Sequence, residues 1–174
     1  GLAVLSRCAG ARATLIERSE LMNDCARLSL ALPENDLFSG RCEIVQADVT
    51  ATGKVRMQSG IHENSFDFAI MNPPFNEAKD RVTPDTLKAE AHVMTQGMLE
   101  KWIRTAAAIV KPGGSVAIIA RPASILELLA ALEKRFGSLA VLPVHPRPQD
   151  PAIRIILKGV KGSRAGLSFH PALI

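Results

Sequence analysis

The chain has 174 residues, of which 47% are hydrophobic and 22% are charged, the composition of a globular protein with a full core. No apolar stretch reaches about 18 residues, so the sequence predicts no membrane-spanning helix. The three cysteines, Cys8, Cys25 and Cys42, are odd in number and lack metal-ligand spacing. We therefore expect a single cytoplasmic domain over residues 1–174, with reduced thiols and no metal.

The formal net charge of +4 comes from the last part of the chain. Residues 1–137 hold 16 basic and 16 acidic side chains, whereas residues 138–174 hold five basic side chains against the single acid Asp150. A basic carboxyl-terminal region is typical of a nucleic-acid-binding surface, but five charges also fit an ordinary solvated face.

The first predicted elements are strands separated by a helix. Residues 13–17 form a short apolar strand, and Ser19 is placed to cap a helix that ends at Pro33. Further strands are expected at 42–49 and 66–71. The apolar face of the helix consists of Leu21, Met22, Cys25, Leu28 and Leu32.

The other expected elements continue this alternation. The last two strands have no helix between them, so we expect an antiparallel hairpin. Alternating strands and helices predict an α/β fold with a mostly parallel sheet covered by helices on both faces. These elements are a polar loop at 50–65, a charged loop at 76–85, a helix at 86–110, a turn at 111–114, a strand at 116–120, a helix at 125–136, and strands at 139–144 and 153–158.

The motif Asn72-Pro73-Pro74-Phe75 follows the strand at 66–71 directly. The two prolines remove two amide donors and fix two φ angles, and each restricts the residue before it to extended geometry. The Asn72 amide and the Pro73 carbonyl are therefore held rigidly at the end of a strand, beside an aromatic ring. This arrangement favours a site for a flat group that carries an amine.

This strand and motif resemble motif IV of the class I S-adenosylmethionine-dependent methyltransferases that modify planar amino groups. The tail is similar to that of the bacterial N6-adenine methyltransferases that act on the valine tRNA anticodon loop. The resemblance implies a Rossmann-like, doubly wound sheet of seven strands, S-adenosylmethionine as cofactor and RNA as substrate. In the tail it rests on Pro146-Arg147-Pro148, Ala152-Ile153-Arg154-Ile155 and the run from Lys158 to Arg164.

One family element is absent from this sequence. Residues 1–5 look like the helix that follows the family's first strand and glycine-rich cofactor loop. Without that central strand, the strands at 13–17 and 66–71 would flank an empty position lined by unpaired backbone groups, at about 1–3 kcal/mol per buried group. We therefore expect a strand and a Gly-x-Gly-type loop before Gly1.

Candidate cofactor residues stand at strand ends, where open α/β sheets bind ligands. Glu17 ends the strand at 13–17, where an acidic side chain accepts hydrogen bonds from ribose hydroxyls. By resemblance, Asp48 accepts from the adenine amine of the cofactor and Val49 stacks nearby, although a lone Asp at a strand end is often only a turn residue. Asn72 also belongs to the expected cofactor site.

The resemblance gives Asn72, Pro73 and Phe75 the catalytic roles. The Asn72 amide oxygen and the Pro73 carbonyl would each accept one N–H of the target amine, so that its lone pair points at the methyl group being transferred. Phe75 would stack on the flipped-out base. His145 and His170 have no metal or nucleophile partners at useful spacing, so we expect structural or substrate-rim roles for them.

The expected partner is RNA, which four basic residues, Arg154, Lys158, Lys161 and Arg164, would bind. Alternation along the last strand places Arg154 and Lys158 on one face. The alternatives to methylation of RNA are methylation of a release-factor glutamine, methylation of a small molecule, and RNA binding without catalysis. The sequence is compatible with a homodimer but does not determine the oligomeric state.

Overall fold

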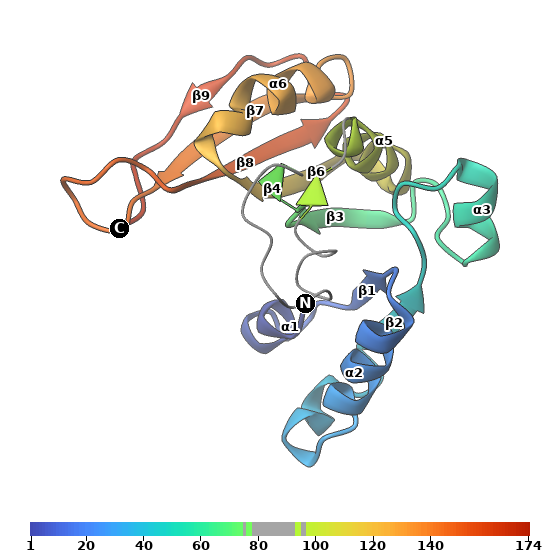
Figure 1. Ribbon diagram of the computed structural model, residues 1–174. Helices are drawn as coiled ribbons and strands as arrows, with labels where there is room; N and C mark the ends of the chain where they lie inside the picture. The colour runs from blue at the N-terminus through green and yellow to red at the C-terminus, as the bar shows by residue number, and fades with distance from the viewer. Residues whose placement is uncertain (75, 78–92, 95–96) are drawn as a thin grey trace. The chain divides into compact units, whose positions relative to one another are not determined.

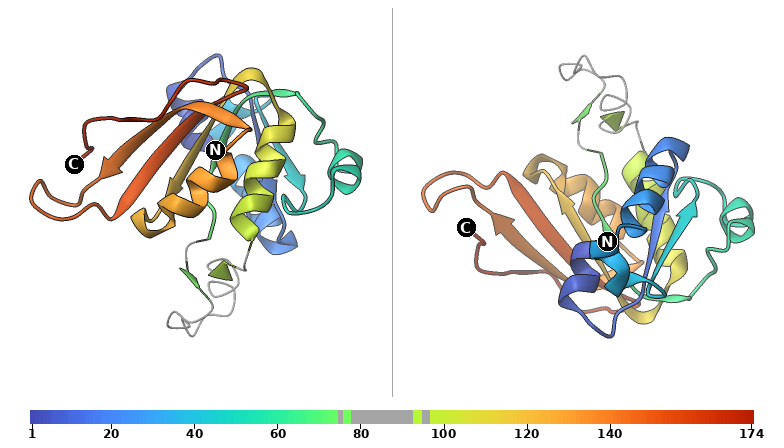
Figure 2. Two further views of the ribbon diagram at one scale, coloured as in Figure 1. Left: turned by 90° about the horizontal axis from the view of Figure 1, so that it is seen from above. Right: turned by 90° about the horizontal axis from the view of Figure 1, so that it is seen from below.

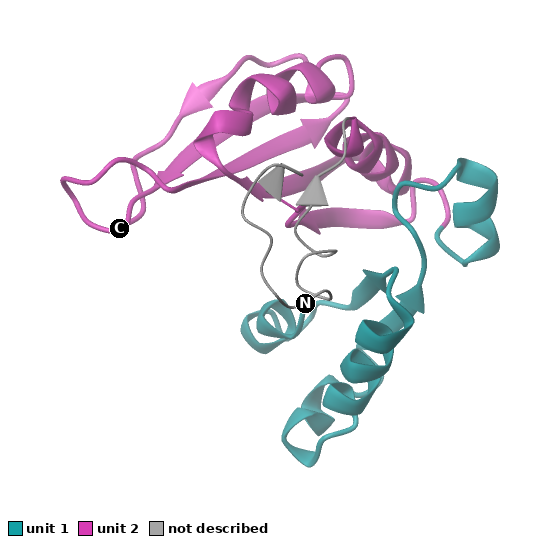
Figure 3. Cartoon of the chain, in the orientation of Figure 1, with its two compact units in different colours: residues 1–61 teal, residues 62–174 magenta. Residues whose placement is uncertain are grey.

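The computed structural model describes residues 1–74, 76–77, 93–94 and 97–174. The chain divides into two compact units, residues 1–61 and residues 62–174 (Figure 3). No helix of the described residues is long and apolar enough to cross a membrane.

Unit 1 contains a parallel pair of strands (Figure 1). Strands β1 and β2 pair in register from Ala13 with Cys42 to Glu17 with Gln46, so both predicted strands are present, but the second ends at Gln46 and not at Val49. Ser19 caps α2 as expected, because its Oγ accepts the Met22 amide at 3.4 Å. The elements are α1 (Leu2–Arg7), β1 (Ala13–Glu17), α2 (Glu20–Leu30), η1 (Pro33–Phe38), β2 (Cys42–Gln46) and α3 (Gly53–Gln58).

Helix α2 packs through polar side chains. The residues of its predicted apolar face are exposed, Leu28 to 71%, whereas Asn23 is buried at 2% exposure. Arg27 donates to Asn23 Oδ1 at 2.8 Å and to the Ile44 carbonyl of β2 at 3.2 Å. The helix was predicted correctly, but hydrogen bonds rather than the leucines join it to the strand pair.

Unit 2 is built on a mixed sheet with the strand order β3-β6-β8-β7-β9. Strand β3 runs parallel to β6, and β8 runs antiparallel to both β6 and β7, which confirms the predicted hairpin. The elements are β3 (Phe66–Met71), β4 (Asn76–Glu77), β5 (Val93–Met94), α5 (Met98–Ile109), β6 (Val110–Ala120), η2 (Pro122–Ser124), α6 (Ile125–Leu132), β7 (Phe136–Val144), β8 (Arg154–Lys161) and β9 (Ser168–Phe169).

Helices α5 and α6 lie on one face of this sheet (Figure 2). The alternation of each strand sends one set of side chains toward these helices, such as Ile118 of β6 and Leu157 of β8, both fully buried. Burial of this apolar surface provides the main stabilisation of the unit. The core comprises Met71, Leu99, Ile103, Ala106, Val116, Ile118, Ala120, Leu128, Ala131, Leu132, Phe136, Val141, Ile155 and Leu157.

The expected mostly parallel sheet of seven strands is not observed as one sheet, and the sheet of unit 2 is mixed. The described residues form a pair of strands, a sheet of five strands, and the short parallel pair β4–β5. Within these residues β1 has only β2 as a neighbour and β3 has only β6. The expected strand before Gly1 stays a prediction.

Several predicted boundaries are wrong. Residues 93–94 belong to β5 and the described part of the predicted helix begins at Met98, with much of 78–96 outside the described residues. The polar loop at 50–65 contains α3. The turn at 111–114 is an irregular start of β6, in which Gly114 has no room for a side chain because a Cβ would lie 2.7 Å from the Asp67 carbonyl oxygen.

Arg41 ties together the turns of unit 1. Its guanidinium lies 5.9 Å from the centre of the buried Phe38 ring and donates at 3.1 Å to the Leu37 carbonyl of η1. The bond to Leu37 comes from Nη2 of the guanidinium. Its second terminal nitrogen, Nη1, faces backbone carbonyls at the end of α1 and in the following turn, and the shortest of these distances is 2.8 Å, to the Ala9 carbonyl oxygen. The other carbonyls are those of Leu5, Cys8 and Ala11.

We expect Arg41→Ala to lower the free energy of unfolding by about 2 kcal/mol, since hydrogen bonds from a charged group would be lost and several carbonyls left without a donor. Arg41→Lys should recover only part of this loss, because an ammonium cannot reach both sets of carbonyls. Urea unfolding of both variants checks this, with the exposed Arg12→Ala as control. Equal stability of Arg41→Ala and Arg12→Ala would contradict the role assigned to Arg41.

Candidate functional site

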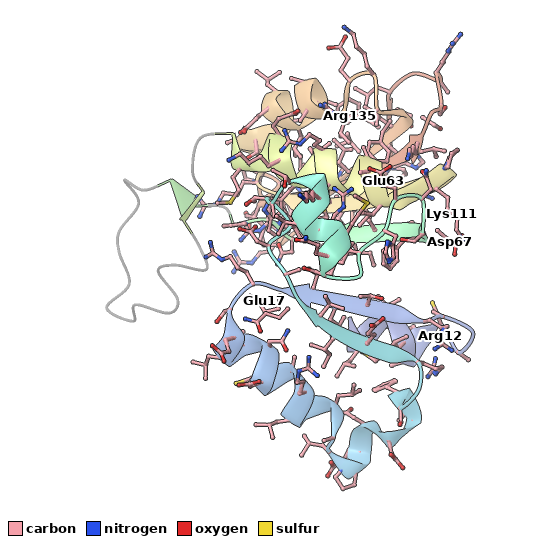
Figure 4. All side chains as sticks on the ribbon, turned by 90° about the vertical axis from the view of Figure 1, so that its right-hand side faces the viewer. Arg12, Glu17, Glu63, Asp67, Lys111 and Arg135 are labelled. Carbon is pink, nitrogen blue, oxygen red and sulfur yellow. The ribbon has the colours of Figure 1, made fainter. Side chains whose placement is uncertain are left out.

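Glu17 stands at the carboxyl end of β1 in unit 1 (Figure 4). Its Oε1 accepts the Ser19 backbone N–H at 2.7 Å, in the turn that leads into α2. The side chain is half-buried, and among the described residues Oε2 has no hydrogen-bond partner. One oxygen therefore orients the carboxylate while the other stays available to accept a hydrogen bond.

Asp48 is held in the same way after β2. Its Oδ1 accepts both the backbone N–H and the hydroxyl of Thr50, each at 2.7 Å. The described part of the chain provides no partner for Oδ2. The sequence analysis missed Thr50, although an Asp followed two residues later by Thr is the pattern of such a turn.

The parallel pairing of β1 and β2 brings these two carboxylates to one edge of the strand pair. Glu17 lies opposite Gln46, and Asp48 follows two residues later. Val49, the third predicted residue at this end, is half-buried. The edge thus offers two fixed carboxylates, which suit a ligand that donates through hydroxyl and amine groups.

Asn72 is placed at the carboxyl edge of the sheet of unit 2. The parallel register pairs Met71 of β3 with Ile118 of β6, and both are buried, so the end of β3 is fixed by the core. The next residue, Asn72, is exposed, whereas Pro73 is buried and Pro74 half-buried. The amide therefore projects from a rigid support, and Phe75 lies outside the described residues.

The predicted RNA-binding residues are distributed along the whole of β8. Strand β8 is antiparallel to β6, so Arg154 lies near the carboxyl end of β6, at the same edge as Asn72. Lys158 is exposed near the middle of the sheet, opposite Ala117 and Ala140. Ile155 and Leu157 are buried, so the expectation that Arg154 and Lys158 share the other face agrees with the structure.

Lys161 and Arg164 lie toward the opposite edge. Lys161 Nζ donates to the Val110 carbonyl at 2.7 Å and to Asn64 Oδ1 at 2.8 Å, at the beginning of β6. Arg164 follows this end of β8 and is exposed. A strand of eight residues spans roughly 25 Å, so these two cations do not gather with Asn72.

The described residues offer no metal centre or activated thiol. No group of three His, Cys, Asp or Glu side chains in this part of the chain is arranged to hold a metal ion. Burial raises the pKa of the Cys42 thiol, which keeps it protonated and weakens it as a nucleophile. The strand-end carboxylates and amide are therefore the candidates for chemistry.

Comparisons with known proteins place these features in context. No family model matches the chain. The crystal structure of a predicted O-methyltransferase from Agrobacterium tumefaciens has a TM-score of 0.84 and 41% identity over all of this chain and 74% of that chain. A tRNA (m1A58) methyltransferase from Aquifex aeolicus has a TM-score of 0.59 at 17% identity, over 93% of this chain and 57% of that one.

A curated relative is similar in sequence. It is the ribosomal RNA large subunit methyltransferase G of Pseudoalteromonas translucida, 26% identical over 142 residues, which are 82% of this chain and 31% of the relative. The chain thus spans about a third of the length of the curated relative that it matches.

Proposed function

Because this chain belongs to the class I S-adenosylmethionine-dependent methyltransferases, we propose that it methylates an exocyclic amine, specifically N6 of an adenine in tRNA. The observation that carries this proposal is the placement of Asn72, exposed after a buried strand end and followed by the buried Pro73. We further propose that residues 1–174 belong to one methyltransferase domain and that the protein works in the cytoplasm.

Asn72 and Pro73 supply what an aromatic amine needs. The nitrogen of such an amine is a weak nucleophile, because its lone pair is delocalised into the ring. Two carbonyl oxygens that each accept one N–H raise the electron density on nitrogen, stabilise the charge that develops there, and align the lone pair for an in-line displacement. The buried Pro73 fixes one acceptor, and the restriction on the residue before proline limits the other.

Unit 1 provides the residues proposed to hold the cofactor. S-adenosylmethionine, when bound, supplies a methyl group on a positively charged sulfur. Glu17 would accept from its ribose hydroxyls and Asp48 from its adenine amine, while Val49 would contact the adenine ring. These residues suit the cofactor because they offer hydrogen-bond acceptors to its hydroxyl and amine groups. In each carboxylate one oxygen is held by backbone or hydroxyl donors, and the other has no partner among the described residues.

Two observations support RNA as the substrate. The curated relative is a ribosomal RNA methyltransferase, and residues 138–174 hold five basic side chains against one acid. Lys158 is better placed for phosphate contacts than Lys161, whose ammonium is engaged by a backbone carbonyl and an amide. Three alternatives would replace this proposal: methylation of a release-factor glutamine, methylation of a small molecule, and RNA binding without catalysis. The proposal holds for a monomer and for a homodimer.

O-methylation is the second candidate, because the relative of 41% identity is described as a predicted O-methyltransferase. A hydroxyl is a poor nucleophile until a base removes its proton. The Asn72 amide cannot take that proton, whereas its oxygen and the Pro73 carbonyl match the two N–H groups of an amine. The chemistry of this end of β3 therefore favours nitrogen.

We expect Asn72→Ala to abolish methyl transfer to RNA and to leave cofactor affinity within about threefold, because the amide serves mainly the target amine. Glu17→Ala should weaken cofactor binding first, since it removes the acceptor for the ribose hydroxyls. Calorimetric titration with S-adenosylmethionine and a tritium-transfer assay separate the two effects. Equal loss of cofactor affinity in both variants would refute this division of roles.

The proposed stacking role makes Phe75 replaceable by other aromatic residues. Phe75→Tyr and Phe75→Trp should retain methylation of RNA, whereas Phe75→Ala should lose about tenfold or more, in keeping with base-stacking energies of about 1–3 kcal/mol. The measurement is kcat/KM on tRNA, with thermal unfolding of each variant as control. Full activity of a stably folded Phe75→Ala protein would remove the ring from the substrate site.

A further inference from the structure

We propose, on the basis of the RNA substrate proposed above, that the segment joining β7 to β8, residues 145–153, holds RNA phosphates beside Asn72 through Arg147. We call this segment the rim. It is a specificity element for the strand that carries the target base, and its main contact is a basic residue that is not among the four expected above to bind RNA.

The strand register places the rim and Asn72 at one edge of the same unit. Residue Val144 at the end of β7 pairs with Arg154 at the beginning of β8, and Ala120 at the end of β6 pairs with Ile155. The parallel pairing of Met71 with Ile118 brings the end of β3 to this edge. Strands are about 4.8 Å apart, so the rim begins two to three strand spacings, roughly 10–15 Å, from Asn72.

Internal hydrogen bonds hold the rim in one conformation. The His145 ring nitrogen Nδ1 lies 2.6 Å from the Asp150 carbonyl oxygen, the Asp150 amide donates to the Arg147 carbonyl at 3.1 Å, and the Ile153 amide closes the loop on Val144 at 3.0 Å. Three of its residues, Pro146, Pro148 and Pro151, are prolines. A loop ordered in advance loses little conformational entropy when it binds a ligand.

Arg147 is held ready for an anion. Its side chain is 79% exposed, and its Nη1 lies 3.3 Å from Asp150 Oδ2. An exposed pair of this geometry is weak, so a phosphate can take the place of the carboxylate. The planar guanidinium matches phosphate oxygens through two parallel hydrogen bonds. Arg154 Nη1 donates to the Ile153 carbonyl at 2.8 Å, which assigns Arg154 to positioning the base of the rim.

The opposite edge of the sheet provides matched controls. Arg164 is an exposed arginine that the sequence predicted to bind RNA, but it follows the far end of β8, so the present proposal assigns it no RNA contact. Lys111 and Asp67 form an exposed ion pair of 2.7 Å at the far edge, the counterpart of the pair in the rim (Figure 4). Matched substitutions at the two edges change the net charge equally, so a difference in RNA affinity between them reflects the position of the residue and not its charge.

The experiment measures the affinity of the purified protein for a fluorescein-labelled, single-stranded RNA of about 20 nucleotides by anisotropy, at several salt concentrations. Arg147→Ala should weaken binding at least about threefold and reduce the log–log salt slope by about 0.7, the loss of one phosphate contact. Arg164→Ala, which removes the same charge at the other edge, should leave both quantities unchanged. Equal effects of the two variants on RNA affinity would overturn the proposal that the rim binds RNA phosphates.

Asp150→Asn gives a test of opposite sign. It removes the carboxylate that competes for Arg147 and keeps the backbone contacts of residue 150, so RNA affinity should rise about twofold or more. Asp67→Asn at the far edge should cause no change. Weaker RNA binding of Asp150→Asn, with an unchanged thermal unfolding curve, would overturn the proposal.

The failure of this inference is distinct from the failure of the proposed function. These binding measurements need neither cofactor nor catalysis. RNA methylation by a protein in which Arg147→Ala and Arg164→Ala behave alike would reject the rim and keep the enzyme. Loss of RNA affinity confined to Arg147→Ala, in a protein that methylates no RNA, would keep the rim as a binding surface and reject the methylation of RNA.

Discussion

The parallel pairing of β3 with β6 is the constraint on which the chemistry proposed for unit 2 depends. Met71 and Ile118 pair at the carboxyl end of these strands, and both are buried under α5 and α6. The chain leaves this core through Asn72 and enters two prolines, the first of which is buried. A side chain between a packed strand end and a buried proline has few conformations to lose, which is what a group that must align a reacting atom requires.

The reversal of β8 decides where charge is available. If β8 ran parallel to β6, its carboxyl end, with Lys161 and Arg164, would lie at the edge of Asn72. Because β8 is antiparallel, these two residues lie toward the opposite edge of the sheet. The residues before β8 gain importance for the same reason. A count of charges along the sequence cannot make this distinction, because it contains no direction.

The fold could be predicted from the sequence where local pattern and packing agree. The apolar strands at 13–17 and 66–71, the Ser19 cap and the final hairpin all follow from hydrophobic runs bounded by polar or turn residues. The short strands at 76–77 and 93–94 have two residues each, too few for a periodic pattern, and α3 is a helix of only six residues. The packing of α2 departs from its apolar pattern, because its leucines are exposed and the buried Asn23 accepts a hydrogen bond from Arg27.

The candidate site was predictable to a similar degree. Strand ends indicated Glu17 and Asp48 as candidates in unit 1 and Asn72 as a candidate in unit 2, and within each unit the parallel pairing places them at the carboxyl edge. The partners that orient the two carboxylates, the Ser19 amide and Thr50, depend on turn geometry that no periodic pattern encodes. The motif Pro146-Arg147-Pro148 marked part of the rim in the sequence, but its place at the edge of Asn72 follows only from the register of the antiparallel strands, which tertiary packing sets.

The most direct test of the central claim is the identity of the methylated atom. Unmodified tRNA would be incubated with the protein and S-adenosylmethionine that carries a deuterated methyl group, then digested to nucleosides and analysed by mass spectrometry. We expect the label on N6 of adenosine. Label on a ribose oxygen, or unlabelled RNA together with labelled protein or small molecule, would contradict it.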